Sequence, residues 1–194
     1  MEDTEDSIGK RIWLWGLPAL ILTGLGLLIY FHNFAPSGTQ NSQEQMEIDL
    51  LERKENDAKI TTYLDFVAQG AEQMKDDHQY YGKALLKLME ATMAASVFAE
   101  FNLGDRLSLV PIHANRVSDN PLEATHADDI RAAADRLSEA LLEIQMAKYP
   151  SLSLEAEAVK EVAERINPDG LTLDQKEVIA SFFSKAAILL DKIN

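Results

Sequence analysis

One uncharged apolar run near the N-terminus constrains this chain more than any other feature. It extends from Ile12 to Phe31 and holds 20 residues. A helix rises about 1.5 Å per residue, so a helix of this length spans roughly 30 Å, the thickness of the hydrocarbon core of a bilayer. No comparable run occurs elsewhere in the 194 residues. The sequence therefore predicts a single transmembrane helix at 12–31, followed by a polar-patterned domain.

The charges around this run predict its orientation. Lys10 and Arg11 precede it directly, and the first basic residue after it is Arg53. Because Lys and Arg are retained on the cytoplasmic side, residues 1–11 are expected to form a cytoplasmic tail. The domain would then lie in the periplasm, or another extracytoplasmic space, on a bacterial inner membrane. A cleaved signal peptide is the alternative, but its apolar region is usually shorter, at roughly 7–15 residues.

Four small residues recur at helical spacing within the apolar run. They are Gly16, Ala19, Thr23 and Gly26. In lipid, close approach at small side chains supplies much of the contact energy between helices. This stripe is therefore predicted to be a packing face for another transmembrane helix. The competing interpretation is that small residues are simply common in such helices.

The composition excludes several classes of function. The chain contains no cysteine, which excludes disulfides, thiolate metal sites and a cysteine nucleophile. Its formal net charge is −14, so phosphate backbones repel it and nucleic acid is not an expected partner. The sequence has no nucleophile elbow, phosphate-binding loop or dinucleotide-binding glycine pattern. The expected partners are therefore other membrane protein subunits.

After the anchor, apolar residues recur with the period of an α-helix. Residues 32–56 are expected to form a linker (32–45) and a helical stalk (46–56). The domain at 57–194 is expected to contain five helices, at residues 57–75, 79–102, 120–148, 153–166 and 172–193. The segment 104–120 is expected to be irregular and to pack back on the core through Leu107, Leu109, Val110 and Ile112.

No segment has the pattern of a β-strand. The chain is therefore predicted to be all-α, with one N-terminal transmembrane helix and an antiparallel, bundle-like domain of about five helices. A solenoid of helical hairpins is the alternative, although the sequence has no fixed repeat period. Five apolar residues of the third predicted helix share one face and are expected to be core: Ile130, Ala134, Leu137, Leu141 and Ile144. The second helix is apolar over much of its circumference, so it is expected to be central.

Several residues are expected to mark helix ends. Gly104 is expected to follow the second helix, because glycine is the usual residue just past a helix C-terminus. Ser153 and Thr172 are expected to cap the fourth and fifth helices through their hydroxyl oxygens. Asn167 to Gly170 has the composition of a turn.

One Glu-x-x-His pattern has a feature of a metal site. Glu123 and His126 would share a helix face, and di-iron bundle proteins use this spacing. Those proteins need the motif twice, plus one Glu from each of two further helices, and here it occurs once. The favoured interpretation is therefore an acidic helix start, which complements the helix dipole.

Two other metal patterns are weaker. A calcium loop around Gly170 would place Arg165 and Lys176 where Asp and Glu are required, which excludes it. A zinc site built from His78, His113 and His126 has no ligand spacing to support it. No metal or other cofactor is therefore predicted.

The remaining apolar and acidic positions have simple interpretations. Most Met and Phe positions are expected to be core: Met74, Met89, Met93, Phe98, Phe101, Phe182 and Phe183. A heme or lipid cavity between apolar helices is the alternative. The acidic positions of the last two helices, such as Glu155, Glu157, Glu161 and Glu164, are expected to form a solvated face.

The favoured hypothesis is a non-enzymatic accessory or scaffold subunit of a membrane protein complex. It would act through protein–protein contacts of its transmembrane helix and its helical domain, and it could form a homo-oligomer. One alternative is a ligand-binding or sensory domain for a lipid, a heme or a small molecule. Another is a carboxylate-bridged metal enzyme that uses Glu123 and His126.

Overall fold

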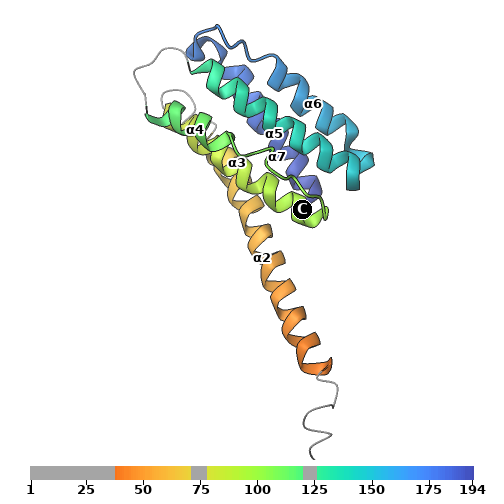
Figure 1. Ribbon diagram of the computed structural model, residues 1–194. Coiled ribbons are helices and arrows are strands. Elements are labelled where there is room, and N and C mark those ends of the chain that lie inside the picture. Colours follow the sequence, from red (N-terminus) through yellow and green to blue (C-terminus); the bar gives the residue numbers. More distant parts are fainter. Residues whose placement is uncertain (1–37, 71–77, 120–125) are drawn as a thin grey trace, which may run out of the picture. The chain divides into compact units, whose positions relative to one another are not determined.

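The computed structural model describes residues 38–70, 78–119 and 126–194, and their regular structure is helical (Figure 1). The helices are α2 (Gly38–Gly70), α3 (His78–Phe98), α4 (Val110–Asp119), α5 (Ala127–Lys148), α6 (Ser153–Glu164) and α7 (Lys176–Ile193). Short 3-10 turns at Pro150–Leu152 and Thr172–Gln175 precede α6 and α7. The predicted transmembrane helix at 12–31, with Gly16, Ala19, Thr23 and Gly26, lies outside the described residues. None of the described helices is long and apolar enough to cross a membrane.

The chain divides into two units, Met1–Asp49 and Leu50–Asn194. The described residues of the first unit, 38–49, are all helical. In the second unit, the rest of α2 and the other five helices contribute to one hydrophobic core. Within it, α3 packs against α4, α5 and α7, so helices distant in sequence share this core. The predicted all-α bundle is confirmed, and these contacts differ from those of a solenoid, whose repeats touch only their neighbours.

Helical periodicity identified most of the core correctly. The stripe of α5 from Ile130 to Ile144 is fully buried. The central position expected for the second helix is confirmed as well, because α3 buries Tyr81, Leu85 and Leu88. It also buries four alanines, which let neighbouring helices approach its backbone: Ala84, Ala91, Ala94 and Ala95.

Aromatic side chains attach α2 to the rest of the bundle. Tyr63 is fully buried, and its Oη donates a hydrogen bond to the backbone oxygen of Phe183 in α7 at 2.8 Å. Phe66 stacks on Tyr80 of α3, with 4.8 Å between the ring centroids. The Nζ of Lys87 lies 5.4 Å from the centroid of the Phe66 ring. Because its surroundings are apolar, burial raises the pKa of Tyr63 well above the ordinary value.

The segment 104–120, which was expected to be irregular, contains the helix α4. A glycine on α3 permits close packing between the two helices. A Cβ at Gly82 would lie 2.6 Å from the backbone oxygen of Ala114 and 2.0 Å from the Oγ of Ser118. The prediction was wrong because α4 has only 10 residues, and short helices depend on packing more than on local propensity.

The apolar residues of this segment divide between core and surface. Leu107 and Val110 are buried, as expected for a segment that packs back on the core. Leu109 and Ile112 are exposed, so the prediction was wrong for these two. The helical geometry of α4 explains the difference, because its buried face carries Val110, Ala114 and Val117 instead.

Three helix ends differ from their predictions. The helix α2 begins at Gly38, inside the segment expected to be a linker. The helix α3 ends at Phe98, and Glu100, not Gly104, adopts the left-handed conformation that closes it, with φ 53°. The N–H groups of Glu100 and Phe101 donate to the oxygens of Val97 and Ser96, which completes a Schellman motif. Ser153 is the first residue of α6 and makes no capping hydrogen bond there.

Thr172 serves a different helix from the one expected. Its Oγ1 accepts a hydrogen bond from the backbone N–H of His126 at 3.1 Å, directly before α5. The side chain lies fully buried in the 3-10 turn that precedes α7. The predicted turn at Asn167 to Gly170 is present, with the N–H of Gly170 donating to the oxygen of Asn167. Thr172 therefore connects the start of α5 to the chain between α6 and α7.

Candidate functional site

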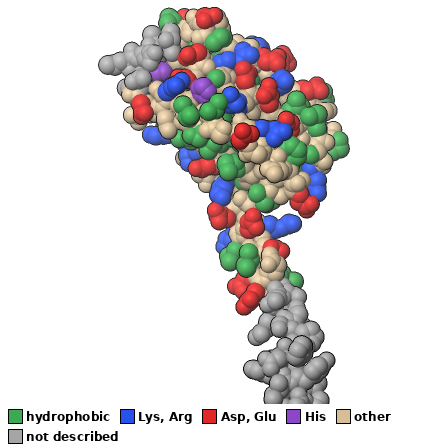
Figure 2. Space-filling view, viewed as in Figure 1, with side chains coloured by type: hydrophobic (Ala, Val, Ile, Leu, Met, Phe, Trp, Pro, Cys, Tyr) green, Lys and Arg blue, Asp and Glu red, His purple; other side chains and the backbone are tan. Residues whose placement is uncertain are grey.

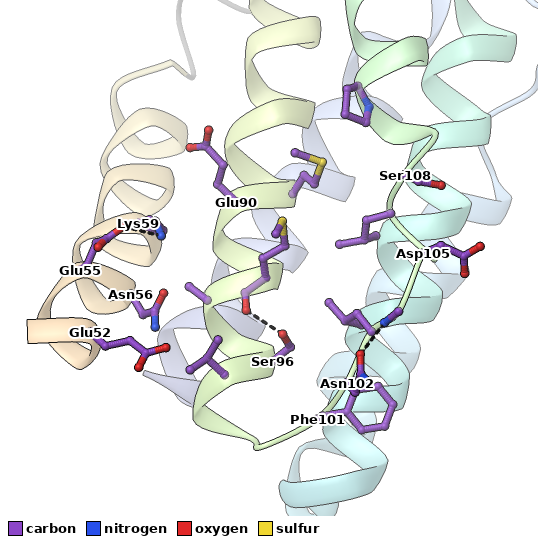
Figure 3. Close-up of a pocket in the computed structure, with 18 residues that line it drawn as sticks. Glu52, Glu55, Asn56, Lys59, Glu90, Ser96, Phe101, Asn102, Asp105 and Ser108 are labelled. Carbon is purple, nitrogen blue, oxygen red and sulfur yellow. Dashed lines mark hydrogen bonds and ion pairs between the residues drawn. The ribbon is translucent and has the colours of Figure 1, made fainter. Parts of the chain in front are cut away.

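The described part of the chain contains a pocket of about 700 Å³ within the unit Leu50–Asn194. The C-terminal half of α3 forms its floor, the α2 residues Glu52 to Lys59 form one wall, and residues 101–108 form the other (Figure 3). We call this the α3 pocket. Its floor is mostly apolar, with Glu90 and Ser96 as its polar residues. Two apolar floor side chains are open to solvent: Met93 is 51% exposed and Val97 is 45% exposed.

The α2 wall carries two carboxylates, one carboxamide and one ammonium group. Glu52, Glu55, Asn56 and Lys59 recur at steps of three, one and three residues, which places them on one face of the helix. The Nζ of Lys59 lies 2.8 Å from Glu55 Oε1, and this hydrogen-bonded ion pair lowers the pKa of Glu55. Glu52 makes no ion pair with any described residue.

Asn56 is the least expected polar residue of the α3 pocket. It is only 5% exposed, yet its carboxamide makes no hydrogen bond with any described residue. Figure 3 shows the carboxamide directed from α2 toward α3. The carboxamide atoms are not among the fully buried polar atoms that lack a partner, so they reach solvent through the pocket. The group is therefore available to anything that enters the pocket.

Arg106 holds the second wall in place. Its Nε lies 2.6 Å from Glu143 Oε2 on α5, and its Nη1 donates to the backbone oxygen of Leu103 at 2.9 Å. Its guanidinium carbon lies 6.0 Å from the centroid of the Phe101 ring. Within the wall, Asn102 Oδ1 accepts a hydrogen bond from the N–H of Gly104 at 2.8 Å. These contacts fix an irregular segment that would otherwise move freely over the floor.

The charged surface outside the pocket is mixed in sign on the face that Figure 2 shows. On the face shown in Figure 2, acidic and basic side chains are interspersed instead of gathered in one patch. Glu157, Glu161 and Glu164 are exposed, as expected for a solvated face. Glu155 is only partly exposed and pairs with Lys192 of α7, which lowers the pKa of Glu155.

The metal-site candidates do not meet in the described structure. Glu123 lies outside the described residues, as does the side chain of His78. His126 is buried directly before α5. His113 Nδ1 lies 2.7 Å from Asp129 Oδ1, which links α4 to α5. The described residues contain no cluster of three or more His, Asp or Glu side chains that could hold a metal ion.

A heme or lipid cavity between apolar helices was the alternative interpretation of the Met and Phe positions, but the place of the α3 pocket was not predicted. Met89, Met93 and Phe101 were interpreted as core. Met89 and Phe101 are partly buried and pack against the core, whereas Met93 is half exposed. All three line the pocket. Phe182 and Phe183 are fully buried, as expected. One signal was present: α3 is apolar on more sides than its packed neighbours can cover, and Met93 and Val97 are four residues apart on one side.

Comparisons with protein-family models, curated proteins and solved structures find no match for this chain. Its function is therefore argued from its own residues.

Proposed function

We propose that this protein is a non-enzymatic accessory subunit, anchored in a membrane by residues 12–31, whose helical domain binds another protein. The observation that carries the proposal is the α3 pocket, with half-exposed Met93 and Val97 between a charged helix wall and a fixed loop wall. Exposed apolar surface rimmed by polar residues is typical of protein contact sites. The small-residue face of Gly16, Ala19, Thr23 and Gly26 supports a second contact, within the membrane.

The test is site-specific photo-crosslinking in native membranes. A photoreactive residue replaces Met93 in one variant and Thr23 in another, and cross-linked proteins are identified after gentle solubilisation. A matched control carries the photoreactive residue at Leu154 of α6, which is 78% exposed and outside the pocket. We expect one membrane protein to be captured from Met93 or Thr23 but not from Leu154. A monomeric protein that captures no partner from either position would refute the proposal.

A ligand-binding domain is the second candidate, favoured by the volume of the α3 pocket. About 700 Å³ falls within the range of small-molecule sites, roughly 300–1,000 Å³. A ligand that binds only the folded state raises the unfolding temperature. A panel of lipids, hemes and small organic cations that leaves this temperature unchanged would count against this candidate.

A further inference from the structure

Three of the carboxylates around the α3 pocket have no ion-pair partner among the described residues. Glu52 on α2, Glu90 on α3 and Asp105 on the loop wall line the pocket, and all three are exposed. None of them forms an ion pair with a described residue; Lys59, the one described cation that lines the pocket, is paired with Glu55. The pocket therefore has an excess of negative charge, which favours an occupant that carries positive charge.

The apolar floor indicates the shape of this occupant. Met93 and Val97 are separated by four residues, so they form one ridge along α3. Such a ridge packs into the groove between the side chains of a second helix. Met89 and Met93 add flexible side chains that adapt to different apolar partners.

Asn56 is a second and independent sign of an occupant. A helix that docks with Lys or Arg side chains beside its apolar face brings N–H donors toward α2. The oxygen of the Asn56 carboxamide can accept from such a donor, which would pair a mostly buried side chain that has no hydrogen-bond partner among the described residues.

We propose that the α3 pocket binds a basic amphipathic helix of the partner protein, with its apolar face on Met93 and Val97 and its cations on Glu52 and Glu90. This inference rests on the proposed function and specifies the chemistry of the partner. Recognition follows the helix-in-groove mode, in which apolar side chains supply most of the affinity and charges select the partner.

A model peptide tests this chemistry. The probe is a fluorescent peptide of about 18 residues, in which Leu and Lys alternate with helical period. A matched peptide replaces every Lys with Glu. Binding is measured by fluorescence anisotropy to the full chain in phosphatidylcholine nanodiscs, with empty nanodiscs as the blank. We expect the Lys peptide to bind, more weakly at high salt, and the Glu peptide not to bind.

Paired variants locate the binding surface. Met93→Asp with Val97→Asp should weaken binding by about tenfold or more, because an apolar anchor contributes at least this much. The control is Met146→Asp with Leu154→Asp, two exposed apolar residues outside the pocket, for which we expect less than about a twofold change. Glu52→Gln with Glu90→Gln should weaken binding, unlike the exposed pair Glu139→Gln with Glu157→Gln.

Asn56→Leu separates recognition from folding. Leu has the same branching at Cγ and the same number of side-chain heavy atoms as Asn, and no hydrogen bond to a described residue is lost. Binding should therefore fall while the unfolding temperature is unchanged or higher. If Asn56 only supported the fold, Asn56→Leu would instead lower the unfolding temperature and leave binding unchanged.

Three outcomes would overturn the inference. They are equal binding of the Lys and Glu peptides, an equal loss in the control pair, and an unfolding temperature raised by octylammonium with no binding of the Lys peptide, which would indicate a small-ligand site. The cross-linking experiment uses the native partner and not this peptide. A captured partner without binding of the Lys peptide refutes this inference alone, whereas the absence of any partner refutes the proposed function.

Discussion

At the scale of single residues, two buried tyrosines of the same core differ in whether their hydroxyl group makes a hydrogen bond. The Oη of Tyr63 donates to the backbone oxygen of Phe183. The Oη of Tyr80 is buried, and the described part of the chain offers it no hydrogen-bond partner. A net hydrogen bond contributes about 1 kcal/mol, while an unpaired buried group has a cost of similar size. The same substitution should therefore have different effects at the two positions.

We expect Tyr63→Phe to lower the free energy of unfolding by about 1 kcal/mol, because a satisfied hydrogen bond is removed. Tyr80→Phe should leave this free energy unchanged or raise it by up to about 1 kcal/mol. Urea unfolding followed by circular dichroism measures both values. A larger loss for Tyr80→Phe than for Tyr63→Phe would contradict this account of the core.

The two left-handed residues around the loop wall allow a reciprocal test. Glu100 has φ 53° and Gly104 has φ 59°, a conformation that costs a non-glycine residue about 1 kcal/mol. Glu100→Gly should therefore raise the free energy of unfolding by up to about 1 kcal/mol, and Gly104→Ala should lower it by a similar amount. Thermal unfolding of the two variants gives the comparison. Equal signs for both changes would exclude backbone strain as the cause.

At the scale of helices, the α3–α4 contact depends on the missing side chain of Gly82. Gly82→Ala should lower the free energy of unfolding by about 2 kcal/mol, because overpacking forces the two backbones apart. Ser118→Ala in the same chain should restore little of the loss. It removes one of the two close contacts, but the backbone oxygen of Ala114 stays in place. Full rescue by Ser118→Ala would show that the Ser118 side chain, and not the backbone oxygen of Ala114, causes the loss of stability.

The helices differ in how far their sequences predict them. The faces of α5 and α7 were predictable, since buried Leu, Ile and Phe residues recur with a 3.6-residue period and few exposed apolar residues obscure it. The helix α4 was missed because its stability depends on the close approach at Gly82, which no local pattern reveals. The end of α3 was predicted too late in the chain. Glycine is the usual residue in the left-handed conformation after a helix, which pointed to Gly104, but Glu100 adopts that conformation first.

The α3 pocket illustrates a different limit. Its lining comes from α2, α3 and the loop wall, which are separate in sequence and become adjacent only through tertiary packing. Met93 and Met89 have the same hydropathy, so composition alone could not indicate which of them is half exposed. Asn56 gave no signal either, because an Asn on a polar helix is ordinary until its burial is known.

At the scale of the whole molecule, the buried phenol groups of three tyrosines make the free energy of unfolding fall at alkaline pH. Burial raises the pKa of Tyr81 to about 12 and raises those of Tyr63 and Tyr80. In the unfolded chain these groups ionise near pH 10, whereas in the folded protein they stay neutral to higher pH. The contribution of these phenols is therefore fully present below about pH 10. That of Tyr81 is lost as the pH rises through about 12, and those of the other two are lost as the pH rises through their own raised pKa values.

We expect the free energy of unfolding to be steady from about pH 8 to 10 and to fall between about pH 10 and 12. The wild type should fall more steeply than Tyr63→Phe, because the variant has one fewer phenol to ionise on unfolding. Urea titrations at each pH measure both curves. Parallel curves would mean that Tyr63 does not contribute to the pH dependence.

The hydrogen bond of Tyr63 also sets an order of events during synthesis. Its acceptor, the backbone oxygen of Phe183, lies 120 positions later in the chain. Similarly, Thr172 lies 46 positions after His126, whose N–H donates a hydrogen bond to it. At about 5–20 residues per second, Tyr63 emerges from the ribosome on the order of 10 s before Phe183 is made. During this interval the apolar face of α2 has been made, but α7, which carries Phe183, has not. The domain can complete its folding only once its last helix has left the ribosome.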